Sequence, residues 1–129
     1  MRLTLALILL LASLAACTGS RGAACEGYFL SCERNAPRPA CQALTPADST
    51  VHAVALDRLV GRVQQDDLAK FMGTHGAPES LAAKAAQADA LWYYDASGRM
   101  DGGMRIGEEG IIAIQNCTVL AQMTLVIYN

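Results

Sequence analysis

Few residues in the sequence are placed to do chemistry on a substrate. The two histidines are His52 and His75, and the adjacent glutamates Glu108 and Glu109 follow later in the chain. A metal site needs two or three converging ligands, and no spacing brings His75 together with the glutamates. Because neighbouring strand residues point to opposite faces, Glu108 and Glu109 are also poorly placed for shared acid–base work. We expect a solvated turn there, with no metal and no cofactor.

The glycine-rich stretch from Asp95 to Gly103 also carries groups that bind ions. Asp95, Ser97 and Asp101 place oxygen atoms at short intervals, and Ca²⁺ prefers oxygen ligands. The EF-hand spacing and its bidentate glutamate are absent from this stretch. The sequence also lacks a Gly-x-Ser-x-Gly elbow, a P-loop and a dinucleotide-binding fingerprint. We therefore predict a polar turn here, and a chain that is not an enzyme.

An aromatic run, Trp92-Tyr93-Tyr94, precedes that loop and has the composition of a β-strand. On a strand, Trp92 and Tyr94 would share one face and Tyr93 would take the other. One interpretation is that these side chains pack in the core. The other is a binding surface, since aromatic residues are enriched at binding hot spots. The candidate partner surface then consists of Trp92, Tyr93, Tyr94, Arg99 and Asp101.

The N-terminus has the pattern of an export signal. Arg2 precedes an apolar run from Leu3 to Leu11, broken only by Thr4, and small residues lead to Cys17. The run is too short for a transmembrane helix, which needs ~20 apolar residues. Leu14-Ala15-Ala16-Cys17 resembles the lipobox of bacterial lipoproteins. The alternative is a plain secretory signal that is cut near Ala16, which would leave Cys17 as an ordinary thiol.

The lipoprotein resemblance implies where the protein resides. In that family the signal is removed just before the cysteine, so Cys17 would carry acyl chains such as palmitate. The residue after the cysteine is Thr18 rather than Asp, which by the family rule directs the protein to the outer membrane. The resemblance therefore implies a lipid anchor on Cys17 and a domain that faces the periplasm.

Four cysteines remain after Cys17: Cys25, Cys32, Cys41 and Cys117. An even set in an exported chain predicts two disulfides, in one of three connectivities. Each connectivity ties Cys117 to the N-terminal segment. A metal site is the alternative, but it would normally include a Cys-x-x-Cys pair, and none is present.

Composition limits the remaining possibilities. The net charge is −2 and aromatic residues make up 5% of the chain. These values give no basic patch and few stacking side chains for nucleic acid. We predict a division into a signal peptide (1–16), an anchor and tether (17–24), an irregular cysteine-containing N-terminal arm (25–47) and a single folded domain (48–129).

Hydrophobic periodicity predicts helices first and strands afterwards. Three helices are expected, at Val51 to Val60 (closed by Gly61), Gln65 to Met72 (closed by Gly73) and Pro78 to Ala90. Strands are expected at 91–94, 104–106, 111–115 and 118–128, with turns at 107–110 and 116–117. The predicted fold class is α+β, with two or three N-terminal helices packed on a three- to four-stranded antiparallel sheet and braced by disulfides.

A second resemblance covers residues 56 to 128. It rests on the segment 61–68, on Phe71-Met72-Gly73 and Pro78, on Leu91-Trp92-Tyr93-Tyr94 and on the final strand-turn-strand. These features are similar to the SmpA/OmlA-type outer-membrane lipoprotein domain and to the related β-lactamase inhibitor proteins. The chain departs from that pattern at Gln64, where the family has a capping threonine. The resemblance implies helices on a sheet and a role in outer-membrane protein assembly.

Two functional hypotheses follow. The first is a non-enzymatic, periplasm-facing outer-membrane lipoprotein that binds a protein partner, such as outer-membrane assembly machinery. The second is an inhibitor or immunity lipoprotein that blocks an enzyme toxin or a cell-wall hydrolase by inserting loops into its cleft. In both hypotheses the membrane is reached through the lipid on Cys17, and nucleic acid is not a partner.

Overall fold

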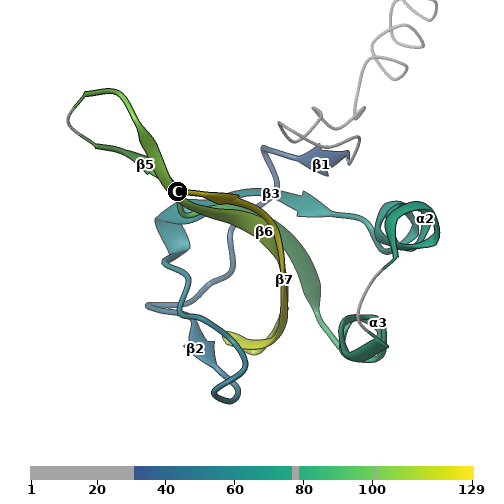
Figure 1. Ribbon diagram of the computed structural model, residues 1–129. Helices are drawn as coiled ribbons and strands as arrows, with labels where there is room; N and C mark the ends of the chain where they lie inside the picture. The colour runs from purple at the N-terminus through teal and green to yellow at the C-terminus, as the bar shows by residue number, and fades with distance from the viewer. Residues whose placement is uncertain (1–30, 77–78, 101) are drawn as a thin grey trace, which may run out of the picture.

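The computed structural model describes residues 31–76, 79–100 and 102–129. The predicted signal peptide, lipid-anchor residue Cys17 and tether lie outside these residues, as do Cys25 and Asp101. A seven-stranded sheet organises the described chain (Figure 1). Its strands are β1 (Cys32–Glu33), β2 (Thr45–Pro46), β3 (Leu59–Val63), β4 (Ala90–Asp95), β5 (Gly98–Arg99), β6 (Arg105–Gln115) and β7 (Thr118–Tyr128).

The strands lie in the order β1-β3-β4-β6-β7-β2, and β5 pairs with β6 beyond this path. The neighbours are antiparallel except β2, which runs parallel to β7. Two helices, α2 (Gln65–His75) and α3 (Glu79–Ala85), connect β3 to β4. A short 3₁₀ helix, η1 (Leu56–Arg58), comes directly before β3.

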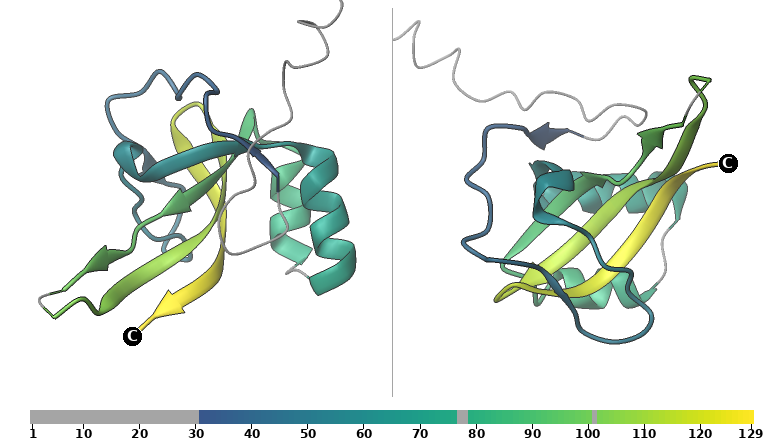
Figure 2. Two further views of the ribbon diagram at one scale, coloured as in Figure 1. Left: turned by 90° about the horizontal axis from the view of Figure 1, so that it is seen from above. Right: turned by 90° about the vertical axis from the view of Figure 1, so that its left-hand side faces the viewer.

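The sheet is buried on both faces, and different parts of the chain cover each face (Figure 2). The helices cover the first face, where Leu68 and Phe71 of α2 and Leu81 of α3 pack against Tyr93 and Ile111. The irregular chain between β1 and β3 covers the second face. There Leu44, Val51 and Val54 pack against Trp92, Tyr94, Ile112 and Ile114.

The predicted fold class is wrong. The sheet has seven strands, not three or four, and the first three strands precede both helices. The helices are also not N-terminal, because they lie between β3 and β4 and cover only one face. The helix-first order implied by the SmpA/OmlA resemblance is therefore not the order of this domain.

The helix predicted from Val51 to Val60 is the clearest error. Val51, Val54 and Leu59 are buried, as their helical spacing suggested, but the segment is irregular up to the single 3₁₀ turn η1 and then enters β3. Burial alternates along β3, which is the two-residue period of a strand. Gly61 is not a helix cap. A Cβ at this position would lie 2.7 Å from the Cys32 sulfur. The absence of a side chain at Gly61 therefore leaves the space that β1 needs to pair with β3.

The turn predicted at Gly107-Glu108-Glu109-Gly110 is also wrong, because β6 runs straight through it. Both glycines make room for neighbouring backbone. A Cβ at Gly107 would lie 2.6 Å from the Ala96 carbonyl oxygen, and one at Gly110 would lie 2.2 Å from that of Met123. Close approach of backbone is a second reason for glycine in a strand, and it is invisible in a single sequence.

Several predicted elements are confirmed. The helix predicted at 65–72 is α2, although it continues through Gly73 to His75 and is capped by Gly76, whose φ is +74°. The predicted strand 91–94 lies within β4. The strands at 111–115 and 118–128 are joined at 116–117, and both turn residues have positive φ. The third helix is shorter than predicted, since α3 spans only Glu79–Ala85.

A disulfide between Cys41 and Cys117 joins the irregular chain to the β6–β7 turn. This pair is one that the sequence left open, and it confirms that Cys117 is tied to the N-terminal segment. Cys32 is disulfide-bonded as well. In the described segments, none of the helices has the length and apolarity needed to span a bilayer.

Candidate functional site

Beyond the end of β4, the chain forms a hairpin in which β5 pairs with the start of β6, and this hairpin projects from the sheet (Figure 1). We call this hairpin, residues 96–106, the arm; it is distinct from the predicted N-terminal arm at 25–47. Arg99 pairs with Arg105 along its stem, and at the tip the Met100 amide donates to the Met104 carbonyl at 2.7 Å. Gly102 and Gly103 have φ of +92° and +83°, a conformation that L side chains rarely adopt. The tip turn therefore requires glycine.

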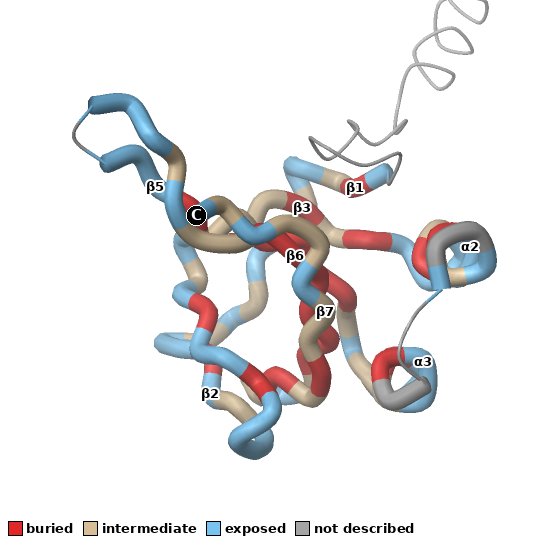
Figure 3. The backbone as a smooth tube through the Cα atoms, viewed as in Figure 1, coloured by how far each residue is buried: buried red, intermediate tan, exposed pale blue. Residues whose placement is uncertain are grey.

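The arm concentrates exposed apolar surface. Among the described residues, the large hydrophobic side chains classed as exposed are Met100 (52%), Met104 (61%), Ile106 (47%) and Ile127 (66%). Three of them belong to the arm, and Ile127 lies at its base, on β7 opposite Glu108. Figure 3 shows the outer part of the arm as exposed, whereas Ser97 at its base and the middle of β4 and β6 are buried. Contiguous exposed apolar surface typically marks an interaction site.

The sides of the arm differ in character. Met104 and Ile106 are two residues apart on extended chain, so they share one side, and Met100 faces Met104 across the tip. The cross-strand pair Arg99 and Arg105 takes the other side. The arm therefore has an apolar side of thioether and alkyl groups and an opposite side with cationic groups.

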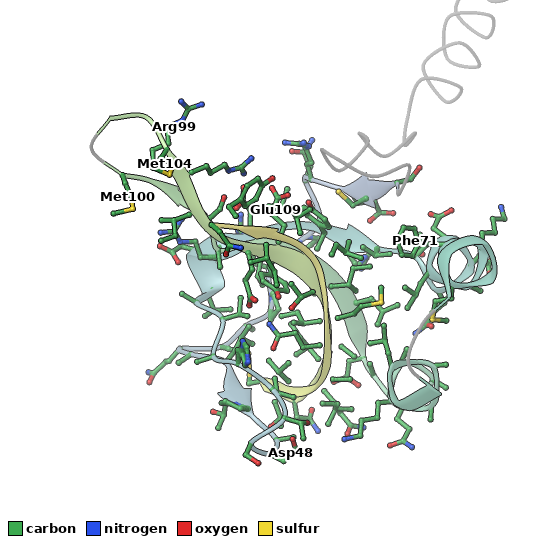
Figure 4. All side chains as sticks on the ribbon, in the orientation of Figure 1. Asp48, Phe71, Arg99, Met100, Met104 and Glu109 are labelled. Carbon is green, nitrogen blue, oxygen red and sulfur yellow. A yellow bond between two sulfur atoms is a disulfide. The ribbon has the colours of Figure 1, made fainter. Side chains whose placement is uncertain are left out.

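A polar clamp anchors the base of the arm, where Figure 4 labels Glu109, and its central group is the Arg105 guanidinium. Nη2 lies 2.8 Å from the Asp95 carboxylate and 2.9 Å from that of Glu109. The same side chain donates to the Ser97 hydroxyl at 2.8 Å and to the Tyr128 hydroxyl at 3.0 Å. The clamp thus joins β4, β6, β7 and the stem of the arm through one cation.

The clamp also explains the electrostatics of this region. Burial raises the pKa of Asp95, but hydrogen bonds from Ser97 and the Arg105 charge outweigh it and hold that pKa below its usual value. Glu109 is only 3% exposed and accepts from the Tyr128 hydroxyl at 2.9 Å. Burial, followed by the Glu109 charge, raises the pKa of Tyr93. One cation thus serves two carboxylates, and its hydrogen bonds hold the base of the arm to the sheet.

Glu108 faces the opposite side of the sheet, as alternation on a strand requires. Tyr94 donates to its carboxylate at 3.1 Å, and Gln122 donates to both Tyr94 and Glu108, at 2.6 and 3.2 Å. The exposed His52 imidazole lies 3.6 Å from the same carboxylate. Because Glu108 and Glu109 lie on opposite faces, they cannot act on one substrate.

The predicted partner surface divides in two. Trp92, Tyr93 and Tyr94 are buried, with Tyr93 facing the helices and the other two facing the irregular chain. They therefore belong to the core and present no surface to a partner, whereas Arg99 is exposed on the arm. The fifth predicted residue, Asp101, lies outside the described residues.

Two recesses of similar volume lie next to each other in the described part of the chain. One, of about 230 Å³, is lined by Pro37, Trp92, Ile114 and the Cys41–Cys117 disulfide, with Arg62 and Asp89 at its rim. The other, of about 240 Å³, shares that rim. Arg62 already pairs with Glu33 at 2.7 Å, and Asp89 accepts from the Asn116 amide at 2.9 Å. In the described parts of the chain, no group of three or more metal-ligating side chains gathers.

The sequence indicated Arg99 as a surface residue of this region, but it did not predict the exposed apolar residues of the arm or the clamp. It treated 95–103 as a polar loop, although Met100, Met104 and Ile106 are apolar residues in and beside that loop. Apolar side chains around a glycine turn were the available signal, because a solvated loop gains nothing from them. The clamp had no such signal, since its members come from four separate places in the chain.

Comparisons with protein-family models, with curated proteins and with solved structures find no match to this chain.

Proposed function

We propose that this protein is a non-enzymatic, periplasm-facing lipoprotein of the outer membrane, anchored through Cys17, that binds a protein partner with its arm. The observation that carries the binding proposal is the exposure of Met100, Met104 and Ile106 on one hairpin, with Ile127 also exposed on the neighbouring strand β7. The anchor and the location rest on the lipobox, Leu14-Ala15-Ala16-Cys17.

The physical support for binding is preorganisation. Association costs free energy for each flexible element that it orders. The clamp already fixes the stem of the arm through four polar partners of Arg105, so docking would order mainly the side chains at the tip. Methionine adapts its shape to a partner at small energetic cost, and it is common on protein-binding surfaces.

The shape of the arm constrains the partner. A narrow projecting hairpin buries its apolar side only if the partner supplies a concave apolar surface. Outer-membrane assembly machinery is the partner that the SmpA/OmlA resemblance suggests. The second candidate is a target enzyme whose cleft the arm would fill, as an inhibitor or immunity protein does. The projection of the arm away from the sheet favours this second candidate.

The test is a crosslinked pull-down of the full-length protein from membranes, identified by mass spectrometry. The test variant is Met100→Ser/Met104→Ser, which removes apolar surface from the tip. The control is Ala82→Gln/Ala83→Gln, which alters exposed positions on α3 far from the arm. We expect wild type and control to capture the same partner and the arm variant to lose it. Equal capture by all three would contradict the proposal.

The identity of the captured partner separates the two candidates. Recovery of assembly components predicts that deletion makes the outer membrane permeable in cells grown alone. Recovery of one soluble enzyme predicts normal membranes but death beside a toxin-producing neighbour, or deregulated wall hydrolysis. Cys17→Ser tests the anchor: the domain should be released into the periplasm, and continued association with the outer membrane would contradict lipidation.

A further inference from the structure

We propose that Met100 and Met104 form a site of reversible oxidation by peroxide-class oxidants, and that their oxidation switches off docking by the arm. The oxidation site stands on the geometry of the tip alone. Its regulatory consequence rests on the proposed function.

Both methionines are exposed, and they lie opposite each other at the tip. Met100 and Met104 are 52% and 61% exposed, and they are paired across the tip by a backbone hydrogen bond of 2.7 Å. Figure 4 labels both side chains on the arm, outside the body of the sheet. Oxidation follows exposure, so an oxidant in solution reaches these two sulfurs without any opening of the domain.

The remaining described methionines provide an internal comparison. Met72 of α2 and Met123 of β7 are partly buried and pack against the core on the helix-covered face of the sheet. Their sulfurs become fully accessible only when that packing opens. The tip should therefore be oxidised first, while the packed methionines stay reduced.

The reaction is a two-electron oxygen transfer. A sulfur lone pair attacks one oxygen of hydrogen peroxide, an S–O bond forms as the O–O bond breaks, and the displaced oxygen leaves as water after proton transfer. Sulfur is oxidised to the sulfoxide and peroxide is reduced. Methionine sulfoxide reductases reverse such lesions, so the change is reversible in a cell that supplies them.

The consequence is local to the arm. A sulfoxide is polar and chiral, so two of them at the tip would replace the apolar surface that docking requires. The clamp does not depend on either methionine, because its partners are Asp95, Glu109, Ser97 and Tyr128. Oxidation at the tip should therefore abolish binding while the domain keeps its melting temperature.

The first experiment measures selectivity without any partner. The purified full-length protein is treated with limiting hydrogen peroxide, and sulfoxide is quantified in peptides that contain each methionine. We expect Met100 and Met104 to react at least several-fold faster than Met72 and Met123, with no shift in melting temperature. Equal rates at all four positions, or unfolding that accompanies oxidation, would overturn the proposed site.

The second experiment measures the switch by pull-down with oxidised protein. Met100→Leu/Met104→Leu keeps an apolar tip that cannot be oxidised, and Met100→Gln/Met104→Gln imitates the polar product. We expect oxidised wild type and the Gln variant to lose capture, and the peroxide-treated Leu variant to retain it. Capture by oxidised wild type would overturn the switch. Loss of capture by the untreated Leu and Ser variants alike would also overturn the switch, since apolarity would then not be what the partner recognises.

The two proposals fail in different ways. If unoxidised wild type and the Ser variant of the arm capture a partner equally, the proposed function fails, whereas selective oxidation of the tip is measured independently. If capture depends on the arm but survives its oxidation, only the switch fails.

Discussion

At Gly110 the sheet leaves no room for a side chain. A Cβ there would lie 2.2 Å from the Met123 carbonyl oxygen and 2.8 Å from the Tyr94 hydroxyl. We expect Gly110→Ala to reduce the free energy of unfolding by about 1–3 kcal/mol, the usual cost of overpacking. Chemical denaturation measures this loss.

Gly98→Ala is the matched control for this prediction. Nothing lies within 4 Å of a Cβ at Gly98, so the substitution should change stability by less than about 1 kcal/mol and could stabilise the strand. Equal destabilisation by the two substitutions would mean that close packing at Gly110 is not what requires glycine there.

Tyr94 makes the domain sensitive to alkali. Burial raises the pKa of its hydroxyl from an ordinary 10.0 to about 12. The unfolded chain therefore loses this proton first as the pH rises. The resulting stabilisation is complete below pH 10 and is lost between about pH 10 and 12, with a further contribution of the same sign from Tyr93.

Tyr94→Phe tests that dependence. It removes the titrating group together with the hydrogen bonds to Glu108 and Gln122, so it should lower stability at neutral pH. Its stability should then decline less steeply than that of wild type above pH 10. Parallel declines in denaturation curves recorded across this range would exclude Tyr94 as a cause.

At the scale of elements, the clamp at the base of the arm is the contact most open to test. Arg105→Met leaves the buried Glu109 carboxylate without its cation. Loss of one partner from a buried pair leaves an uncompensated charge, so we expect a clear loss of stability, moderated because the Arg105 side chain is 37% exposed. Denaturation of Arg105→Met measures the loss.

Two comparisons make that result specific. Arg99→Met removes an exposed arginine from the same arm and should change stability little. Glu109→Gln in the Arg105→Met background removes the uncompensated charge and should restore part of the loss. Equal losses from Arg99→Met and Arg105→Met would show that the clamp does not hold the arm.

The elements also show what a sequence can predict. The hairpin of β6 and β7 was predictable because apolar β-formers flank a short turn at 116–117. β3 was not predictable, because Val51, Val54 and Leu59 recur at helical spacing. In the structure, Val51 and Val54 belong to the irregular chain that covers the sheet, and Leu59 begins a strand of the sheet itself. The sequence correctly predicted a strand at Trp92, Tyr93 and Tyr94. It did not predict that both faces of this strand are buried, because that depends on the helices covering one face and the irregular chain covering the other.

At the scale of the whole molecule, the disulfide between Cys41 and Cys117 ties one covering layer to the sheet. It joins residues separated by 76 positions, and closing a loop of that length is worth about 4 kcal/mol in the chain-entropy account. We expect Cys41→Ala/Cys117→Ala to lower the melting temperature strongly. A variant that melts with wild type would show that the bridge adds nothing to stability.

A second variant separates the bridge from its backbone. Cys117 has φ of +65° at a turn position that favours glycine, so the disulfide holds a conformation that is costly for a cysteine. Cys41→Ala/Cys117→Gly should therefore lose less stability than the double alanine variant, by about 1 kcal/mol.

The measurement that tests the central claim most directly is photocrosslinking from the tip of the arm in living cells. A photoreactive residue is placed at Met104, and in a matched strain at Ala82 on α3. The account predicts a discrete crosslinked protein from position 104, and none from position 82. Crosslinks of equal pattern from both positions, or from position 82 alone, would contradict the arm as the binding element of this protein.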